Sequence, residues 1–330
     1  MTSRSLLVGD IGGTNARFAL ANPDKPGFDT VKTYKCADYV SANLAIARYL
    51  EETSASNPAA ICIAAAGPIV GNSVQFTNNN WQISANDLRA EFQVEQVQLL
   101  NDFEAIAYAI PWLEEGDLRS VGLPAAADIS TGDFSVGIIG PGTGLGAAGL
   151  RKRGDSVFPI VGEGGHVGFA PETQLQVRLH DVLRTRFDRV SDERLVSGPG
   201  IENIFSALNT IDGRQSPVLD AAGIFAEAAA SSKSTAAQAV QVFYEVLGQV
   251  AGNLALSMGG FDGIYIGGGI VQRNPDLMAN SRFRNGFEMK GRYRPLLEKT
   301  PTSIILHQNP GLLGASFYAM RMLQDPEPHG

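Results

Sequence analysis

The chain has 330 residues, 44% of them hydrophobic and 18% charged, a composition typical of a globular protein long enough for two domains. Its formal net charge of −8 argues against nucleic acid or an anionic membrane surface as a partner. It has two cysteines, no signal-peptide pattern and no run of eighteen apolar residues, so we expect a cytoplasmic protein without disulfides, metal clusters or a membrane span.

Residues 6–20 are predicted to form a strand, a tight glycine turn and a second strand. Gly12, Gly13 and Thr14 offer consecutive backbone N–H groups around an open loop, a shape suited to phosphate oxygens. Asp10, at the mouth of this loop, is placed to hold a hydrated Mg²⁺ beside the phosphates. On this stretch alone, an ordinary β-hairpin with an exposed aspartate is the alternative.

The rest of the first half alternates strands and helices. Apolar spacing and capping residues predict a strand at 30–36, a helix at 42–51, a buried strand at 59–66, a loop at 69–81, a helix start at 84–87, a strand at 94–100 and a helix at 101–110. This order predicts an α/β unit with a mixed sheet.

Beyond Pro111 the pattern starts again, which predicts two domains of related architecture facing a shared cleft. The predicted strands are 134–139, 145–150, 156–161, 262–266 and 303–306. The predicted helices are 173–187, 200–208, 221–230, 235–258 and 312–323, and the tail 325–330, with two prolines, is expected to be loose.

Residues 140–146 are a second candidate phosphate loop, Gly-Pro-Gly-Thr-Gly-Leu-Gly. Gly142, Gly144 and Ala147 also match the G-x-G-x-x-A dinucleotide fingerprint, the main alternative here. That fingerprint needs a helix next, whereas residues 147–154 indicate a strand and a turn. The pattern therefore favours a phosphate loop between two strands.

Asn101 and Asp102 stand where a strand ends and a helix begins, a position that favours a carboxylate through the first-turn N–H groups. A plain helix cap is the commoner use. The functional interpretation makes Asp102 a general base that accepts a hydroxyl proton in phosphoryl transfer. A base must be ionised, so the two interpretations are compatible.

Glu163 and His166 lie in the glycine-rich stretch 162–168, where missing side chains permit close approach. A carboxylate and an imidazole can together bind adjacent hydroxyls of a sugar. A glycine-rich surface turn is the alternative, and a zinc site is disfavoured because no second histidine or cysteine lies nearby at ligand spacing.

Three weaker candidates complete the set. Thr77 and Asn78 open an amide-rich stretch that suits either hydroxyl recognition or a turn. Glu193 alone resembles a solvated surface charge. The triple glycine 267–269 after a buried strand permits close approach by a flat group such as adenine, or forms a tight turn.

Together these stretches resemble the bacterial glucokinase family, within the superfamily of sugar kinases, chaperones and actin-like ATPases. The resemblance covers almost the whole chain and rests on motifs at 10–17, 100–103, 140–146, 162–166 and 195–200. It implies an α/β fold of two ribonuclease H-like (actin/hexokinase-type) domains flanking a cleft, and a kinase that uses ATP and Mg²⁺ to make glucose 6-phosphate from glucose.

The resemblance also implies residue roles. Asp102 is the base that takes the proton from the sugar 6-hydroxyl. The sugar-binding residues are Asn101, Asp102, Glu163, His166 and Glu193. The nucleotide-binding residues are Asp10, Gly12, Gly13, Thr14 and Asn15 in the first loop, Gly142, Thr143 and Gly144 in the second, and Gly267, Gly268 and Gly269 on the adenosine side.

The resemblance further implies a small domain at 1–111 plus 308–330, a large domain at 112–307 that carries a homodimer interface, and closure on sugar. Gly168 departs from the family, whose members often have an acidic or hydroxyl residue there. Two other functions remain open: a kinase for another hexose or amino sugar, and a non-catalytic sugar-responsive regulator. An actin-like ATPase would need no Glu163/His166 loop.

Overall fold

The computed structural model describes residues 5–55, 58–76, 80–126, 128–129, 131–215 and 217–324. Thr77, Asn78 and the tail 325–330 lie outside these ranges. The chain divides into unit 1, Met1–Glu114 with His307–Gly330, and unit 2, Glu115–Leu306. Among the described residues, no helix has the length and apolar character needed to cross a membrane.

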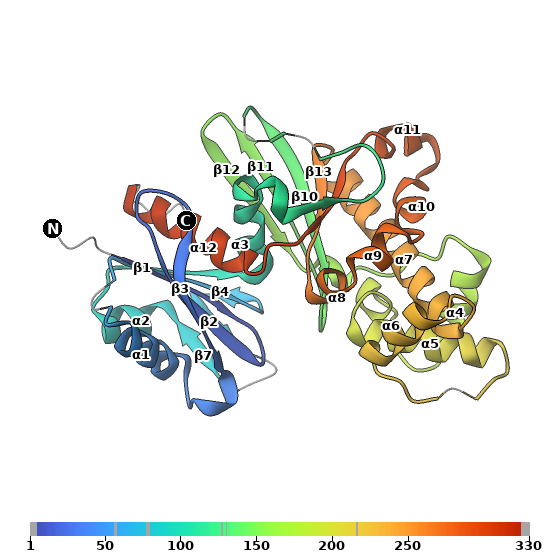
Figure 1. Ribbon diagram of the computed structural model, residues 1–330, viewed down its shortest axis with the longest axis horizontal. Coiled ribbons are helices and arrows are strands. Elements are labelled where there is room, and N and C mark those ends of the chain that lie inside the picture. The colour runs from blue at the N-terminus through green and yellow to red at the C-terminus, as the bar shows by residue number, and fades with distance from the viewer. Residues whose placement is uncertain are drawn as a thin grey trace. The chain divides into compact units, whose positions relative to one another are not determined.

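Unit 1 is built on a mixed sheet with the strand order β3-β2-β1-β4-β8 (Figure 1). Its strands are β1 Leu6–Ile11, β2 Asn15–Ala21, β3 Phe28–Lys35, β4 Ala60–Ala65 and β8 Gln96–Asn101. β1, β2 and β3 form an antiparallel meander, while β4 and β8 run parallel to β1. Every residue of β4 is buried because helices cover both faces of the sheet, as its unbroken apolar run predicts.

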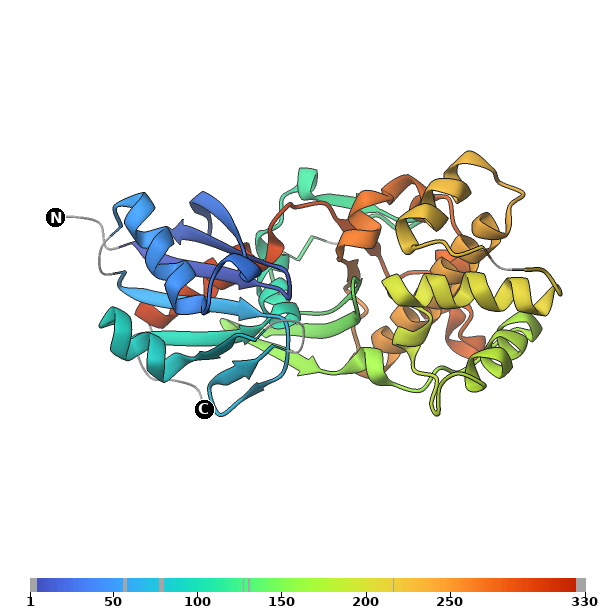
Figure 2. The same cartoon turned by 90° about the horizontal axis from the view of Figure 1, so that it is seen from below.

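Among the residues that the structure describes, four α-helices cover this sheet. α1 (Ala42–Thr53) and α2 (Ala85–Phe92) lie on one face, and α3 (Asp102–Ala109) and α12 (Pro310–Gln324) lie on the other (Figures 1 and 2). Ser41 and Ser84 cap α1 and α2 by accepting backbone N–H groups, as the sequence predicts. The C-terminal helix therefore completes the domain that the N-terminal strands begin.

A small three-stranded sheet occupies part of the stretch expected to be a loop. Its strands are β5 Ile69–Val70, β6 Ser73–Gln75 and β7 Gln82–Ser84. Strands of two or three residues are too short to show an alternating pattern, which is why the sequence did not predict them. The Trp81 indole anchors this region by donating to the Tyr39 carbonyl at 3.0 Å.

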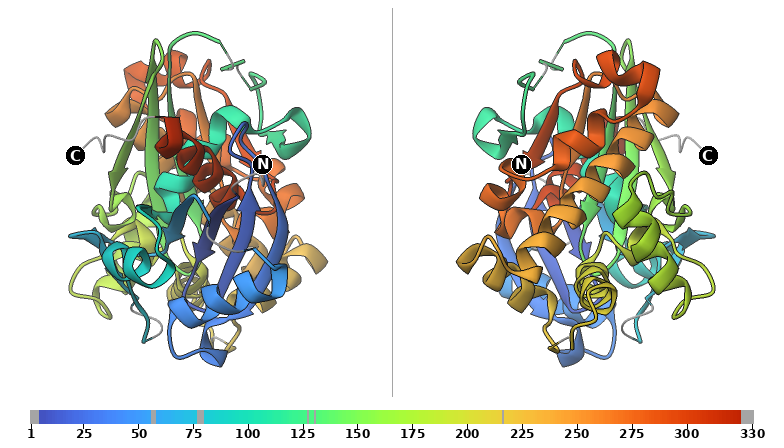
Figure 3. Two further views of the ribbon diagram at one scale, coloured as in Figure 1. Left: turned by 90° about the vertical axis from the view of Figure 1, so that its left-hand side faces the viewer. Right: turned by 90° about the vertical axis from the view of Figure 1, so that its right-hand side faces the viewer.

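Unit 2 has a six-stranded sheet with the order β12-β11-β10-β13-β14-β9 (Figure 3, long strands in green). Its strands are β9 Leu118–Ser120, β10 Phe134–Pro141, β11 Leu145–Arg153, β12 Ser156–Gly162, β13 Gly263–Ile266 and β14 Thr302–Ile305. From β12 to β14 the strand order repeats that of the unit 1 sheet. β10, β11 and β12 form an antiparallel meander, and β13 and β14 run parallel to β10. The predicted α/β class and repeated architecture are confirmed.

The helices of unit 2 include the long helix α7 (Thr235–Met258), whose side chains join the main apolar core. The others are α4 Gln174–Arg184, α5 Gly198–Ile211, α6 Ala221–Ala230, α8 Gly269–Arg273, α9 Pro275–Ala279, α10 Phe283–Glu288 and α11 Arg294–Leu297. α4, α5 and α6 lie together beside α7 (Figure 2), and α10 packs directly against it.

In the described ranges, six single turns of 3₁₀ helix link these elements: η1 Cys36–Asp38, η2 Ile110–Trp112, η3 Glu115–Asp117, η4 Gly164–His166, η5 Asp192–Arg194 and η6 Gly291–Tyr293. The sequence predicted the long helices α6 and α7 to the residue but not α8 to α11. Those four helices span four to six residues each, fewer than two turns, so they show no helical periodicity.

Candidate active site

The carboxyl ends of three parallel strands meet at one edge of the unit 1 sheet. Ile11, the last residue of β1, pairs with Ala65 of β4, which in turn pairs with Asn101 of β8. The glycine turn after β1 and the Asp102 carboxylate after β8 therefore stand at the same edge. Ligands of α/β sheets bind at such an edge.

The first glycine turn is closed by its own backbone. The Gly12 N–H donates to the Asn15 carbonyl at 3.0 Å, and the Cys36 N–H donates to the Thr14 carbonyl at 2.9 Å. The sequence predicts three open N–H groups here, but the Gly12 N–H is engaged within the turn. This bond shapes the loop that Gly13 and Thr14 present.

Asp10 sits beneath this turn in a mostly buried position. Its carboxylate lies 3.7 Å from the Arg17 guanidinium, and a Cβ placed on Gly311, in the first turn of α12, would come within 3.2 Å of it. Burial raises the Asp10 pKa, and Arg17 opposes that rise. A side chain at position 311 would therefore require the carboxylate to shift by a few tenths of an ångström.

A magnesium ion would fit beside Asp10 only if a phosphate group shared its coordination with the protein. Within the described ranges, no three His, Cys, Asp or Glu side chains are grouped to enclose a metal. Mg²⁺ keeps several waters and is usually bound through one or two carboxylates plus substrate phosphates. One carboxylate beside a phosphate-sized turn suits that mode.

Asp102 is held at the N-terminus of α3 by a capping box. The Asn101 Oδ1 accepts the N–H groups of Phe103 and Glu104 at 2.9 and 3.4 Å, and the Glu104 carboxylate accepts the Asn101 N–H at 3.2 Å. The half-buried Asp102 carboxylate accepts the Phe103 N–H at 3.0 Å. This N–H and the positive end of the helix dipole both favour the ionised form that a base requires.

Asn101 already has structural partners. Besides capping α3 through Oδ1, it donates from Nδ2 to the Gly67 carbonyl at 3.3 Å, which ties the end of β8 to the end of β4. The second Nδ2 proton is the remaining donor with which Asn101 could contact a sugar.

In unit 2 the corresponding edge carries the second glycine turn. The Gly142 N–H donates to the Gly144 carbonyl at 2.8 Å, which closes this turn within its own backbone over one residue fewer than the first turn. The Gly142 carbonyl accepts the N–H of Gly198, the first residue of α5, at 2.8 Å. β11 follows the turn as an antiparallel strand, so the dinucleotide fingerprint is ruled out by the lack of its helix.

The triple glycine 267–269 lies against this second turn. The Gly267 N–H donates to the Ile139 carbonyl at 2.9 Å, and a Cβ on Gly268 would collide with the Pro141 carbonyl oxygen. Gly268 also has a φ of +87°, which side chains rarely adopt. The sequence predicts that another group approaches these glycines closely. In the structure the backbone of Ile139 and Pro141 does so.

The glycines between Glu163 and His166 also serve packing. A Cβ on Gly165 would overlap the Leu145 carbonyl oxygen, and one on Gly164 would lie 2.8 Å from the Ala147 Cβ. The close approach that these glycines permit brings the loop onto β11. Glu163 and His166 themselves are exposed at the surface of unit 2.

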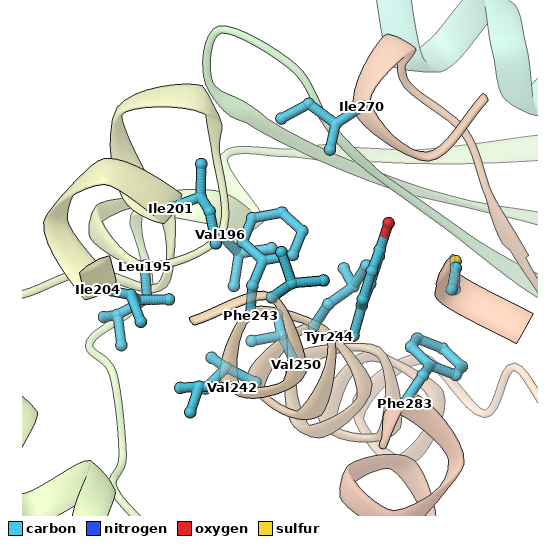
Figure 4. Packing of buried hydrophobic residues seen from close by; sticks show 14 of the residues in the cluster. Leu195, Val196, Ile201, Ile204, Val242, Phe243, Tyr244, Val250, Ile270 and Phe283 are labelled. Carbon is cyan, nitrogen blue, oxygen red and sulfur yellow. The ribbon is translucent and has the colours of Figure 1, made fainter. Parts of the chain in front are cut away.

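Glu193 links the loop region to the second glycine turn. Its Oε2 accepts the Leu145 N–H at 3.0 Å, and a Cβ on Gly144 would lie 2.5 Å from the same oxygen. Two residues further on, Leu195 and Val196 enter the core and pack toward Phe243 of α7 (Figure 4). Glu193 is therefore a fixed carboxylate at the turn and not a solvated surface charge.

The site residues thus form two groups. Unit 1 brings together Asp10, Gly12, Gly13, Thr14, Asn15, Asn101 and Asp102, and unit 2 brings together Gly142, Thr143, Gly144, Glu163, His166, Glu193, Gly267, Gly268 and Gly269. Two further residues hold the unit 2 group in place. Gly198 donates to the Gly142 carbonyl, and the Ser-Gly-Pro-Gly helix start could have pointed to it in the sequence. Arg189 donates to the His166 carbonyl, and no sequence pattern pointed to it.

Known proteins resemble this chain in both sequence and structure. The glucokinase family model matches residues 7–322. A glucokinase of Aromatoleum aromaticum is 41% identical over 94% of this chain and 93% of its own. The crystal structure of a glucokinase from an Antarctic psychrotroph is 33% identical, with a TM-score of 0.87 over 96% of this chain and 99% of that one.

A ROK family glucokinase from Streptomyces griseus, solved in complex with glucose and AMPPNP, has a TM-score of 0.64 at 19% identity and covers 96% of this chain and 99% of its own. It therefore shares the fold. Repeated mixed sheets with glycine turns at equivalent edges define a sugar kinase of the actin-like ATPase fold. Within that class, the chain belongs to the glucokinase family.

Proposed function

We propose that this sugar kinase transfers the γ-phosphoryl group of ATP to the 6-hydroxyl of D-glucose, which gives glucose 6-phosphate and ADP. Family membership supports the reaction. The single observation that carries the mechanism is the pairing of Ile11, Ala65 and Asn101, which sets the first glycine turn and Asp102 at one sheet edge.

Asp102 acts as the general base. The 6-hydroxyl oxygen attacks the γ-phosphorus, its proton passes to the Asp102 carboxylate, and the bond from the γ-phosphorus to the β,γ-bridging oxygen breaks to release ADP. The loose transition state of phosphoryl transfer requires positioning and charge neutralisation more than covalent chemistry. The capping box around Asn101 supplies that positioning for the base.

The two glycine turns bind the phosphates through backbone N–H groups of Gly13, Thr14 and Asn15 in unit 1 and of Thr143 and Gly144 in unit 2. Gly12 and Gly142 shape the turns. Mg²⁺, when bound, neutralises charge on the phosphates, and Asp10 would hold it through water. The turn at 267–269 faces the adenosine.

Glucose is bound by Asn101, Glu163, His166 and Glu193, with Thr77 and Asn78 as further candidates. Carboxylates accept hydroxyl protons, while imidazole and amide groups donate to hydroxyl oxygens, so the set suits a polyhydroxyl substrate. We further propose a homodimer formed through unit 2 and a cytoplasmic location; light scattering of the purified protein tests the first.

A coupled ADP-release assay with Mg-ATP, run without sugar and then with a panel of hexoses, tests this function. ADP release with glucose and with no other hexose of the panel supports the proposed function. Release with another hexose or amino sugar would keep the mechanism and change the substrate. Release that does not depend on sugar would indicate an ATPase, and no release at all would favour a sugar-responsive regulator. Chelation of Mg²⁺ should abolish the glucose-dependent release.

A further inference from the structure

The segment 189–193 runs alongside the loop that carries Glu163 and His166. The Phe169 N–H donates to the Val190 carbonyl at 3.1 Å, and the Asp192 N–H donates to the Val167 carbonyl at 2.9 Å. An isolated β-bridge joins Gly168 to Ser191 between these bonds. The loop is therefore held on one side by this segment and on the other by Leu145 of β11.

Arg189 adds a charged contact to this pairing. Its Nη1 donates to the His166 carbonyl at 2.6 Å, and a Cβ placed on Gly168 would lie 3.5 Å from its Nη2. The guanidinium therefore lies along the backbone of 166–168. A planar guanidinium with several fixed donors holds a carbonyl in one orientation better than a flexible ammonium does.

Arg189 has other charged residues among its neighbours. Asp192 is 6% exposed, and Arg189 and Lys290 are the cations that act on it. Lys290 is itself paired with Glu172 at 3.2 Å. Within the part of the chain that the structure describes, Asp192 has no ion pair within 4 Å, so the Arg189 guanidinium is not tied to it and donates to the His166 carbonyl instead.

We propose that Arg189 is a positioning residue for sugar binding. It does not touch the substrate; it holds the His166 carbonyl and so fixes the orientation of the His166 imidazole against the sugar hydroxyls. This proposal rests on the proposed function of His166 and Glu163 in binding glucose. Its effect belongs to sugar affinity, because the hydrogen bond that Arg189 donates goes to the loop that carries His166.

Steady-state kinetics of Arg189→Ala tests this role. Loss of one charge-assisted hydrogen bond at an exposed site should raise the KM for glucose about three- to tenfold and leave the KM for ATP and kcat within about twofold. Arg189→Gln, which keeps an N–H donor but not the charge, should fall between wild type and Arg189→Ala. Calorimetric titration with glucose alone should show the same order of affinities.

Arg186→Ala is the matched control. Arg186 lies three residues earlier and donates to the Ser206 hydroxyl at 3.0 Å, away from the loop. An unchanged glucose KM in Arg189→Ala, or an equal rise in Arg186→Ala, would overturn the role of Arg189 while leaving the kinase assignment intact. A wild-type protein without glucose-dependent ADP release would overturn the proposed function, and this inference with it.

Discussion

At the scale of single residues, the structural position of Asp102 suits the role of general base proposed for it. As the first residue of α3 it lies within the capping box of Asn101 and Glu104, and its carboxylate accepts the Phe103 N–H at the sheet edge. We expect Asp102→Ala to lower kcat by a factor of about 10²–10⁴, the usual contribution of a general base, while glucose still binds.

Turnover and calorimetric glucose binding measured on the same preparation check this prediction. Asp87→Ala is the matched control, because Asp87 is a first-turn acid of α2 and should leave kcat unchanged. Near-normal turnover of Asp102→Ala would show that another group takes the proton.

Glu163 is predicted to act on the sugar and not on the nucleotide. Removing a carboxylate that accepts hydroxyl protons should raise the KM for glucose about tenfold or more and leave the KM for ATP nearly unchanged. Asp155→Ala, at the opposite end of β12, serves as the control. A selective effect of Glu163→Ala on ATP would contradict the sugar-binding role.

Asp192 makes unit 2 sensitive to pH. Burial raises its pKa to about 7, and the positive charges of Arg189 and Lys290 oppose this rise. Since the folded-state pKa lies above the unfolded value of 3.8, the folded protein holds the proton more tightly. The resulting stabilisation is full below about pH 4 and is lost as the pH rises to about 7.

Asp192→Asn should therefore unfold at a higher temperature than wild type at pH 8 and at a similar temperature at pH 4. The gain at pH 8 is on the order of 1–4 kcal/mol, because one pKa unit corresponds to 1.36 kcal/mol. Thermal unfolding followed by circular dichroism across this pH range provides the measurement. A lower melting temperature of Asp192→Asn at pH 8 would mean that the ionised carboxylate stabilises the fold.

At the scale of elements, α3 is positioned by close packing on α12. A Cβ on Gly314 of α12 would overlap the Ala105 carbonyl oxygen of α3. The two backbones can approach this closely only because position 314 lacks a side chain. Since α3 carries Asp102, this contact between elements far apart in sequence also positions the residue proposed as the general base.

Gly314→Ala should destabilise unit 1 by about 1–3 kcal/mol, the usual cost of overpacking. Urea unfolding followed by circular dichroism measures the loss. Gly116→Ala, where an added Cβ meets nothing within 4 Å, should have the stability of wild type. Equal stabilities of the two variants would show that α3 and α12 can separate without cost.

At the scale of the whole molecule, ligand binding should stabilise the folded chain by mass action. Glucose at one hundred times its Kd should contribute about 2.7 kcal/mol and raise the melting temperature by several degrees, in the absence of nucleotide. A hexose that elicits no ADP release is the control. If glucose leaves the melting temperature unchanged while turnover is normal, glucose binds only after ATP.

Local patterns predicted most of the fold. The long helices α6 and α7, the buried strand β4 and both glycine turns follow from periodicity, capping and turn chemistry among neighbouring residues. The short strands β5, β6 and β7 and the helices α8 to α11 did not, because too few residues form each one to leave a pattern. Tertiary contacts stabilise them instead, such as the hydrogen bond that the Trp81 indole donates to the Tyr39 carbonyl.

The sequence by itself determined the chain's family, its repeated α/β architecture and the identity of the candidate site residues, since these depend on motifs in a fixed order. Only the tertiary structure decided how those residues are held: Glu193 on the Leu145 N–H, Gly165 against the Leu145 carbonyl and Arg189 on the His166 carbonyl. These contacts join residues about 20 to 48 positions apart. Such partners depend on how the strands and loops come together in three dimensions, which no local pattern encodes.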